Sequence, residues 1–330
     1  MLPVLDLATA DTDPAGFRIA LREAAHTAGF FYLVGHGVPA HELSGILTLA
    51  REFFALPEAA KQQISQLDSP QFRGYSRLGG ELTNGEVDWR EQVDIGPERP
   101  AIPGAEGYLR LQGPNLWPDA LPAFQPAFER WTTLLSEVGS RLLRHWSVSL
   151  GAAENHFDAA FAERPATLIK VVRYPGTGGT TQGVGAHKDS GVLTLLLVEP
   201  GSHGLQVELD SGWIDIEPLP GAFIVNIGEL LEVATGGYLR ATRHRVLAPP
   251  PGTDRISIPY FLNPALDATI PIITLPPELA ALSRGVEADP NNPIFDTYGA
   301  NAWKSRTRAH PDVAWKHHGI RPAGQASTRR

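Results

Sequence analysis

Apolar residues recur at helical spacing in the first half of the chain and in short continuous runs in the second half. Residues 14–28 carry apolar side chains every three to four positions and end at Gly29, after which FFYLV predicts a buried strand. Residues 39–66 predict two helices that a break at Pro57 separates. Residues 120–150 return to helical periodicity and predict one long helix whose apolar stripe packs into a core.

Two segments depart from this regular pattern. Residues 69–118 are rich in Gly, Pro and polar residues, and long segments of this kind within a compact domain are usually functional covers or disordered. We therefore expect loops that cover a substrate there. Residues beyond Pro264 are irregular until residues 297–319, which predict one helix across the end of the molecule.

Between Thr167 and Pro264 the chain consists of short strand-like runs separated by turn-forming clusters of Gly, Pro, Asp and Ser. The runs are TLIKVVRYP, GVLTLLLVE, GLQVEL, GWIDIEP, AFIVNIG, TRHRVLA and RISIPYFL. Since no helical pattern separates them, they predict an antiparallel sandwich or jelly roll and not a parallel α/β sheet.

Composition narrows the classes of function. The 330 residues are 42% hydrophobic and 19% charged, which is ordinary for a globular protein, and the formal net charge is −8. This acidic balance gives no electrostatic footprint for nucleic acid or an anionic membrane. The absence of cysteine excludes disulfides, thiolate metal sites and thiol nucleophiles, so histidine and carboxylate are left as metal ligands.

Candidate metal ligands lie in two of the predicted strands. His187 and Asp189, in GAHKDSG, are separated by one residue, and alternate side chains of a strand point the same way. His244, in ATRHRVLAP, is the candidate third ligand from a second strand. Two histidines and one carboxylate are the donor set that holds ferrous iron and leaves other positions open to substrates.

Arg255 and Ser257, in RISIPYFL, share one strand face by the same rule. A guanidinium beside a hydroxyl suits a bidentate, charge-assisted grip on a carboxylate. The alternative interpretation is a salt bridge on the surface of a strand, and the nearby metal motif favours carboxylate binding.

These residues form part of a longer pattern that also includes GFFYLVGHGV near the N-terminus and RYPG in the middle. Over nearly its whole length the chain resembles the isopenicillin N synthase-like dioxygenases, which depend on ferrous iron and 2-oxoglutarate. The resemblance implies a mainly β fold with flanking helices around a double-stranded β-helix, a cupin-like jelly roll, that carries His187, Asp189 and His244. It also implies that Arg255 and Ser257 hold the distal carboxylate of 2-oxoglutarate and that Tyr174 supplies a third contact.

Within this family GYSRLGGELTNGEVD, GGYLRATRHRV and RTRAHPD are similar to the bacterial branch that includes the ethylene-forming enzyme. That similarity implies an amino-acid substrate contacted by Glu81, Thr83, Arg173 and Arg308. Two positions depart from the pattern. Lys188 stands where Thr or Ser is commoner, and Ser190 stands where the ethylene-forming enzyme has Tyr. Hydroxylation is therefore expected in preference to ethylene formation.

The sequence thus predicts an oxidoreductase that uses Fe(II), O2 and the cosubstrate 2-oxoglutarate to oxidise a small polar or amino-acid-like molecule. Hydroxylation is the expected outcome, with release of succinate and CO2. Leu193, Val246 and Phe261 are expected to keep water away from the reaction, and Phe261 is also a candidate substrate contact.

Other functions compatible with the pattern stay open at this point. One is an isopenicillin N synthase type of oxidase that works without 2-oxoglutarate, in which Arg255 and Ser257 hold the carboxylate of the substrate itself. A second is ethylene formation. The third is not an enzyme but a β-barrel binding protein whose metal is structural or absent.

The predicted regions form one integrated catalytic unit. Residues 1–118 are the N-terminal helix and strand region with the covering loops, 119–166 the helical support, 167–264 the catalytic core, and 265–330 a C-terminal segment with a helix over the barrel. We expect a small-molecule substrate and neither nucleic acid nor membrane as partner. The N-terminus lacks the features of a signal peptide, so a cytoplasmic location is expected. The sequence gives no indication of oligomeric state.

Overall fold

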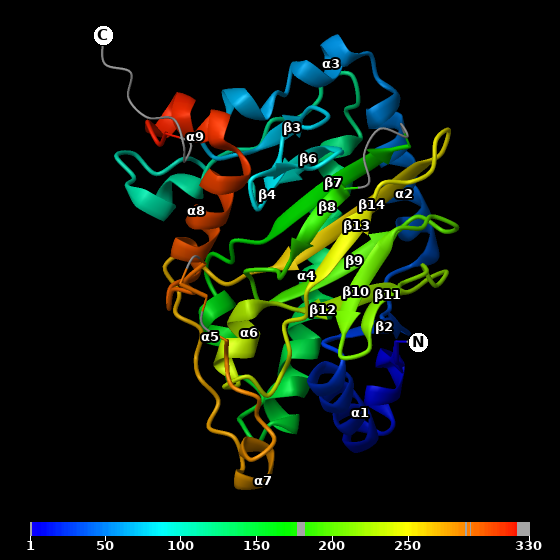
Figure 1. Ribbon diagram of the computed structural model, residues 1–330, viewed down its shortest axis with the longest axis vertical. Coiled ribbons are helices and arrows are strands. Elements are labelled where there is room, and N and C mark those ends of the chain that lie inside the picture. Colours follow the sequence, from blue (N-terminus) through cyan, green and yellow to red (C-terminus); the bar gives the residue numbers. More distant parts are fainter. Residues whose placement is uncertain (1, 177–181, 288, 291, 322–330) are drawn as a thin grey trace.

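Two β-sheets face each other and form the centre of the protein (Figure 1). The computed structural model describes residues 2–176, 182–287, 289–290 and 292–321. The larger sheet has the order β1 (Val4–Asp6), β2 (Phe30–Val34), β12 (Phe223–Ile227), β9 (Leu193–Val198), β14 (Asp254–Leu262), β7 (Leu168–Pro175), β6 (Glu91–Ile95) and β3 (Gly74–Ser76). The smaller sheet has the order β11 (Gly212–Asp215), β10 (Leu205–Leu209), β13 (His244–Leu247) and β8 (Gln182–His187). Apart from the parallel pair β1–β2, neighbouring strands pair antiparallel, which confirms the predicted jelly-roll class.

Helices pack on the outer face of the larger sheet and at its ends (Figure 1). They are α1 (Pro14–Thr27), α2 (Ala40–Ala55), α3 (Glu58–Gln62), α4 (Phe124–Ser149), α5 (Asp158–Phe161), α6 (Glu229–Ala234), α7 (Pro277–Ala280), α8 (Tyr298–Ala309) and α9 (Pro311–His318). Short 3-10 helices are η1 (Leu7–Asp11), η2 (Gln66–Asp68) and η3 (Gly107–Leu111). The helices predicted in residues 14–28, 39–66 and 120–150 are confirmed, including the break at Pro57. No helix among the described residues has both the length and the apolar content needed to cross a bilayer.

The larger sheet is buried on both faces, and strand β9 shows how its sequence allows this. Leu193, Leu195 and Leu197 pack into the core shared with the helices. Leu196 and Val198, which point the opposite way, pack into a second core between the two sheets. A strand covered on both faces reads as a continuous apolar run, which explains LTLLLV.

Three predictions about secondary structure were incomplete or wrong. Residues 69–118, predicted to be loops, contain β3, the hairpin β4 (Leu82–Thr83) and β5 (Glu86–Val87), and the fully buried strand β6. The short helix α6 lies within the segment predicted to be strands only. Residues 297–319 form two helices, because the chain leaves helical geometry at His310, just before Pro311. Residues 322–330 of the predicted C-terminal segment lie outside the described residues.

Strand β6 was missed because its sequence, EQVDI, is polar at three of five positions although all five are buried. Buried carboxylates require partners. Glu91 Oε2 accepts hydrogen bonds from Lys61 Nζ at 2.7 Å and from the Tyr75 hydroxyl at 2.6 Å. Its other oxygen, Oε1, accepts one from Arg173 Nη1 at 2.6 Å.

Asp94, on the other face of β6, is completely buried and joins the sheet to the C-terminal helices. Its carboxylate accepts hydrogen bonds from Arg306 of α8 and, at 3.0 Å, from Gln66 of η2. Lys170 Nζ of β7 lies 3.8 Å from Asp94 and donates at 2.7 Å to Glu81, which also pairs with Arg90 at 2.9 Å. This buried ionic network holds α8 against the open end of the two sheets.

We expect Asp94→Asn to lower the free energy of unfolding by about 3–5 kcal/mol, because it leaves the buried guanidinium of Arg306 without its carboxylate. Urea denaturation followed by tryptophan fluorescence measures the change. The matched control is Asp158→Asn, which removes an exposed pair with Arg144 and should cost less than about 1 kcal/mol. Equal losses in the two variants would contradict a role for the buried network.

The same network predicts acid sensitivity. Burial raises the pKa of Glu81, but the charges of Arg90 and Lys170 outweigh it and hold the pKa well below the ordinary value of 4.5. A carboxyl whose folded pKa is depressed stabilises the fold above its unfolded pKa and loses that contribution as the pH falls. The free energy of unfolding should therefore fall below about pH 4.5, and less steeply in Glu81→Gln. Identical slopes between pH 5 and pH 3 in urea denaturation would exclude this contribution.

Candidate metal and cosubstrate site

The antiparallel pairing of β13 with β8 places His244 directly opposite His187. Their ring centroids lie 4.4 Å apart. Asp189 follows the end of β8, and its Oδ1 lies 3.5 Å from His187 Nε2 and 3.7 Å from His244 Nε2. Among the described residues these three form a group whose ligand atoms all lie within 4.8 Å of one another.

The structure corrects the reason given for the position of Asp189. His187 is the last residue of β8, so Asp189 does not lie on the same strand. Instead, its backbone carbonyl accepts a hydrogen bond at 2.7 Å from the amide of Glu229, the first residue of α6, and Leu230 bonds to Gly191 in the same way. The start of α6 therefore anchors the bend that turns Asp189 toward the histidines.

Both imidazoles are oriented by backbone carbonyls. His187 Nδ1 lies 2.8 Å from the carbonyl of Gly185, and His244 Nδ1 lies 3.1 Å from that of Thr242. A carbonyl can only accept, so each Nδ1 carries the proton and each Nε2 keeps its lone pair for a metal. Burial and the neighbouring His187 lower the pKa of His244 to about 4, which favours the neutral ring that ligation requires.

The carboxylate of Asp189 has its two oxygens in different environments. Oδ2 accepts hydrogen bonds from Thr194 Oγ1 at 2.5 Å and Asn226 Nδ2 at 2.8 Å, and Oδ1 faces the histidines. Burial raises the pKa of Asp189, but the two histidines and the hydrogen bond from Asn226 more than compensate and hold it well below its usual range. The group is therefore an anionic ligand of fixed orientation. Its donor set of two imidazole nitrogens and one carboxylate oxygen fits iron(II).

Arg255 and Ser257 lie on the same face of β14, as predicted, and are 1% and 2% exposed. Arg255 Nη1 donates to Ser257 Oγ at 3.0 Å, and the guanidinium carbon lies 4.8 Å from the centre of the Tyr174 ring. Arg255 Nε is buried without a hydrogen-bond partner, and no carboxylate of the described residues forms an ion pair with this side chain. A buried cation without an anion is costly, so the arrangement fits a carboxylate of 2-oxoglutarate.

One large cavity connects the candidate metal ligands with Arg255, Ser257 and Tyr174. It lies between the two sheets and beneath α8, and its apolar wall includes Val246 and Phe261, as predicted. Leu193 does not line it but packs on the opposite face of β9. The other apolar side chains that line the cavity come from the core between the sheets, namely Phe30, Val184, Leu196 and Leu205.

The predicted substrate contacts divide into two groups. Glu81, Thr83 and Arg308 line the cavity, although two of them already have strong partners. Glu81 is paired with two cations of the buried network, and Thr83 Oγ1 donates to Asp88 at 2.7 Å. Arg308 Nη1 lies 3.3 Å from Asn292 at the rim.

Arg173 is not brought to this cavity. It follows the alternation of β7, so it points away from the face that carries Tyr174. Its guanidinium pairs with Glu91 at 2.6 Å and with Asp254 at 2.7 Å. Both its position and its partners therefore correct the prediction that it contacts the substrate.

Sequence reasoning missed three polar residues of the site. Thr194 and Asn226 interrupt the apolar runs GVLTLLLV and AFIVNIG, and this interruption was the available signal. Glu229, at the start of α6, lines the cavity beside Asp189, and none of the described residues forms an ion pair with it. Burial raises the pKa of Glu229 to about 7, although Lys304 and Lys188 partly oppose the effect.

Comparison with known proteins supports this interpretation. Residues 2–120 match the model for the non-haem dioxygenase in morphine synthesis N-terminal region, and residues 166–264 match that of the 2OG-Fe(II) oxygenase superfamily. The 2-oxoglutarate-dependent dioxygenase frbJ of Dothideomycetidae sp. (strain 11243) is 35% identical, over 96% of this chain and 91% of that protein. Homoarginine-6-hydroxylase 2-ODD-C23.1 of Arabidopsis thaliana is 33% identical, over 76% of this chain and 77% of its own.

A solved structure agrees with these relatives. The 2OG-Fe(II) oxygenase family protein from Caulobacter crescentus superposes with a TM-score of 0.74 at 26% identity, over 92% of this chain and 97% of that chain. The paired strands that carry His187 and His244 thus belong to a known fold for iron and 2-oxoglutarate chemistry. This chain belongs to the 2OG-Fe(II) oxygenase superfamily and is a non-haem iron, 2-oxoglutarate-dependent dioxygenase.

Proposed function

We propose that this dioxygenase hydroxylates a small amino-acid-like molecule and that Glu229 binds a cationic group of that substrate. The observation that carries the proposal is the carboxylate of Glu229, which lines the cavity next to Asp189 and forms no ion pair with any described residue. Cations also line the cavity, where α8 presents Lys304 and Arg308, and Lys304 is near enough to Glu229 to affect its pKa. Walls of both signs complement a molecule with an ammonium and a carboxylate group.

In this proposal His187, Asp189 and His244 hold iron(II), while Arg255, Ser257 and Tyr174 hold the distal carboxylate of 2-oxoglutarate. When bound, iron with O2 and 2-oxoglutarate supplies the oxidation of a substrate C–H bond, and 2-oxoglutarate becomes succinate and CO2. The protein contributes position and shielding. Leu196, Leu205 and other apolar residues between the sheets exclude water, and the carboxylate of Asp189 is kept in place by Thr194 and Asn226.

Relatives support an amino acid as the substrate class. The Arabidopsis relative is named for the hydroxylation of homoarginine, an amino acid with a cationic side chain. The similarity to the ethylene-forming branch would give the cation-binding role to Glu81, but Arg90 and Lys170 already neutralise that carboxylate. We therefore assign the role to Glu229. Because Ser190 also lacks the aromatic ring of that branch, hydroxylation is the proposed outcome and ethylene formation is not.

Replacement of Arg255 tests the cosubstrate site. Arg255→Gln removes the buried cation, so we expect kcat/KM for 2-oxoglutarate to fall by roughly 30-fold to several thousand-fold, the equivalent of about 2–5 kcal/mol. Succinate formation and oxygen uptake are measured with iron(II) present. The control Arg141→Gln, on the surface of α4, should match wild type. Oxygen uptake that needs no 2-oxoglutarate would point to an oxidase of the isopenicillin N synthase type.

Replacement of Glu229 tests the substrate class. A panel of homoarginine, arginine, lysine and the uncharged analogues norleucine and citrulline is screened for hydroxylated product and for coupled succinate release. We expect a cationic amino acid to be preferred. Glu229→Gln should reduce kcat/KM for it at least tenfold, about 1.4 kcal/mol, and change turnover of uncharged analogues much less. Glu208→Gln, a half-buried carboxylate on β10 that pairs with Arg243 away from the cavity lining, is the control. Equal losses for charged and uncharged analogues would exclude recognition of a cation by Glu229.

A further inference from the structure

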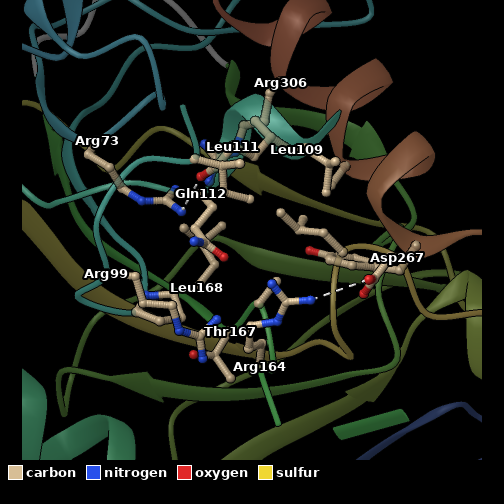
Figure 2. Close-up of a pocket in the computed structure, with 16 residues that line it drawn as sticks. Arg73, Arg99, Leu109, Leu111, Gln112, Arg164, Thr167, Leu168, Asp267 and Arg306 are labelled. Atoms are coloured by element: carbon tan, nitrogen blue, oxygen red, sulfur yellow. Dashed lines mark hydrogen bonds and ion pairs between the residues drawn. The ribbon is translucent and has the colours of Figure 1, made fainter. Parts of the chain in front are cut away.

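A second cavity is lined by residues of α8, η3, the start of β7 and the segment 97–102 (Figure 2). Leu168, Tyr298, Ala302 and Arg306 line both cavities, so these side chains form a shared wall. The inference drawn from this cavity does not rest on the proposed substrate.

Four arginines line this second cavity, and Figure 2 shows Arg73, Arg99 and Arg164 entering it from different segments. The fourth is Arg306, whose Nη1 is occupied by Asp94 and whose Nη2 is buried without a hydrogen-bond partner. Asp267 supplies the one carboxylate among the described lining residues, and it lies 3.5 Å from Arg164. The lining thus carries a clear excess of positive charge.

Arg73 is the central feature of this excess. Its side chain is buried, with 8% of the residue exposed, and Nη2 donates to the carbonyl of Leu111 at 3.2 Å. Its Nε has no partner, and no carboxylate of the described residues lies within ion-pair distance. Nearby Glu98 instead accepts hydrogen bonds from Asn115 and Trp117. A buried guanidinium without an anion is costly to the fold.

The pKa values of the arginines reflect the same imbalance. Burial and the charge of Arg306 lower the pKa of Arg73 to about 10, and burial and the charge of Arg164 lower that of Arg99. An arginine side chain keeps its positive charge at neutral pH, so this mutual repulsion persists. A bound anion would relieve both the burial cost and the repulsion.

The surroundings hold Arg73 in place and limit the size of the site. A Cβ at Gly96 would stand 2.3 Å from Arg73 Nη2, so glycine there makes room for the guanidinium. The rest of the lining is largely apolar and includes Ile102, Leu109, Leu111, Leu168 and Leu266. The cavity has a volume of about 50 Å³, which suits an anion of a few heavy atoms and not a hydrocarbon chain.

We propose that this cavity binds a small anion, a free carboxylate or phosphate of a few heavy atoms, that contacts Arg73, Arg99 and Arg164. The site is separate from the 2-oxoglutarate site, since Arg255 lines the other cavity and not this one. Its ligand also reaches Arg306 and so contacts the helix that forms the wall of the active site.

Isothermal titration calorimetry of the iron-loaded protein, under nitrogen and with saturating 2-oxoglutarate, tests the proposal. The probes are acetate, inorganic phosphate and methylamine, with the 2-oxoglutarate site already filled. We expect saturable binding of at least one anion and none of methylamine, and the tighter of the two anions identifies the anionic group. Binding of neither anion, or binding that 2-oxoglutarate abolishes, would overturn the proposal.

Variants locate the binding. Arg99→Gln and Arg164→Gln change side chains that are less buried than Arg73, so they test the site even if Arg73→Gln fails to fold. Each should weaken binding of the anion tenfold or more. Arg144→Gln removes a similarly exposed arginine that pairs with Asp158 on another surface, and it should bind like wild type. Unchanged affinity in both pocket variants would place the anion elsewhere, whatever the outcome of the succinate assays.

Discussion

The antiparallel register between β8 and β13 is the constraint on which the whole catalytic arrangement depends. It places His187 opposite His244, and a shift by one residue would turn one imidazole to the other face of the sheet. The third candidate ligand does not depend on that register. Asp189 is turned toward the histidines by the start of α6 and by Thr194 and Asn226 on the facing sheet. The metal site therefore exists only when both sheets and the connecting helix are in place.

Much of the core and the placement of the candidate cosubstrate residues could be predicted because the relevant residues follow local rules. Arg255 and Ser257 share one regular strand, so alternation alone puts them on one face. The helices show their apolar stripes directly, and the turn clusters separate the strands of the jelly roll. The argument for Asp189 failed on the strand, yet it pointed to a carboxylate whose oxygen the structure brings within 4.8 Å of both histidines.

The remaining errors share one physical cause, which is that partners distant in sequence decide where a polar side chain lies. Glu91 and Asp94 look like loop residues until Lys61, Lys170 and Arg306 neutralise them inside the fold. Arg173 was assigned by likeness of motif, although its place on β7 directs it to Glu91. Electrostatic pairing of this kind leaves no periodic trace in the chain.

Helix α8 belongs to two cavities at once, through Tyr298, Ala302 and Arg306. The β4–β5 hairpin, by contrast, contributes Leu82 and Thr83 to the active-site cavity alone. Directed evolution of this enzyme would therefore have different effects in these two segments, although both line the active-site cavity. Changes confined to the hairpin alter the lining of the active-site cavity alone, whereas changes at Tyr298, Ala302 or Arg306 alter the lining of both cavities.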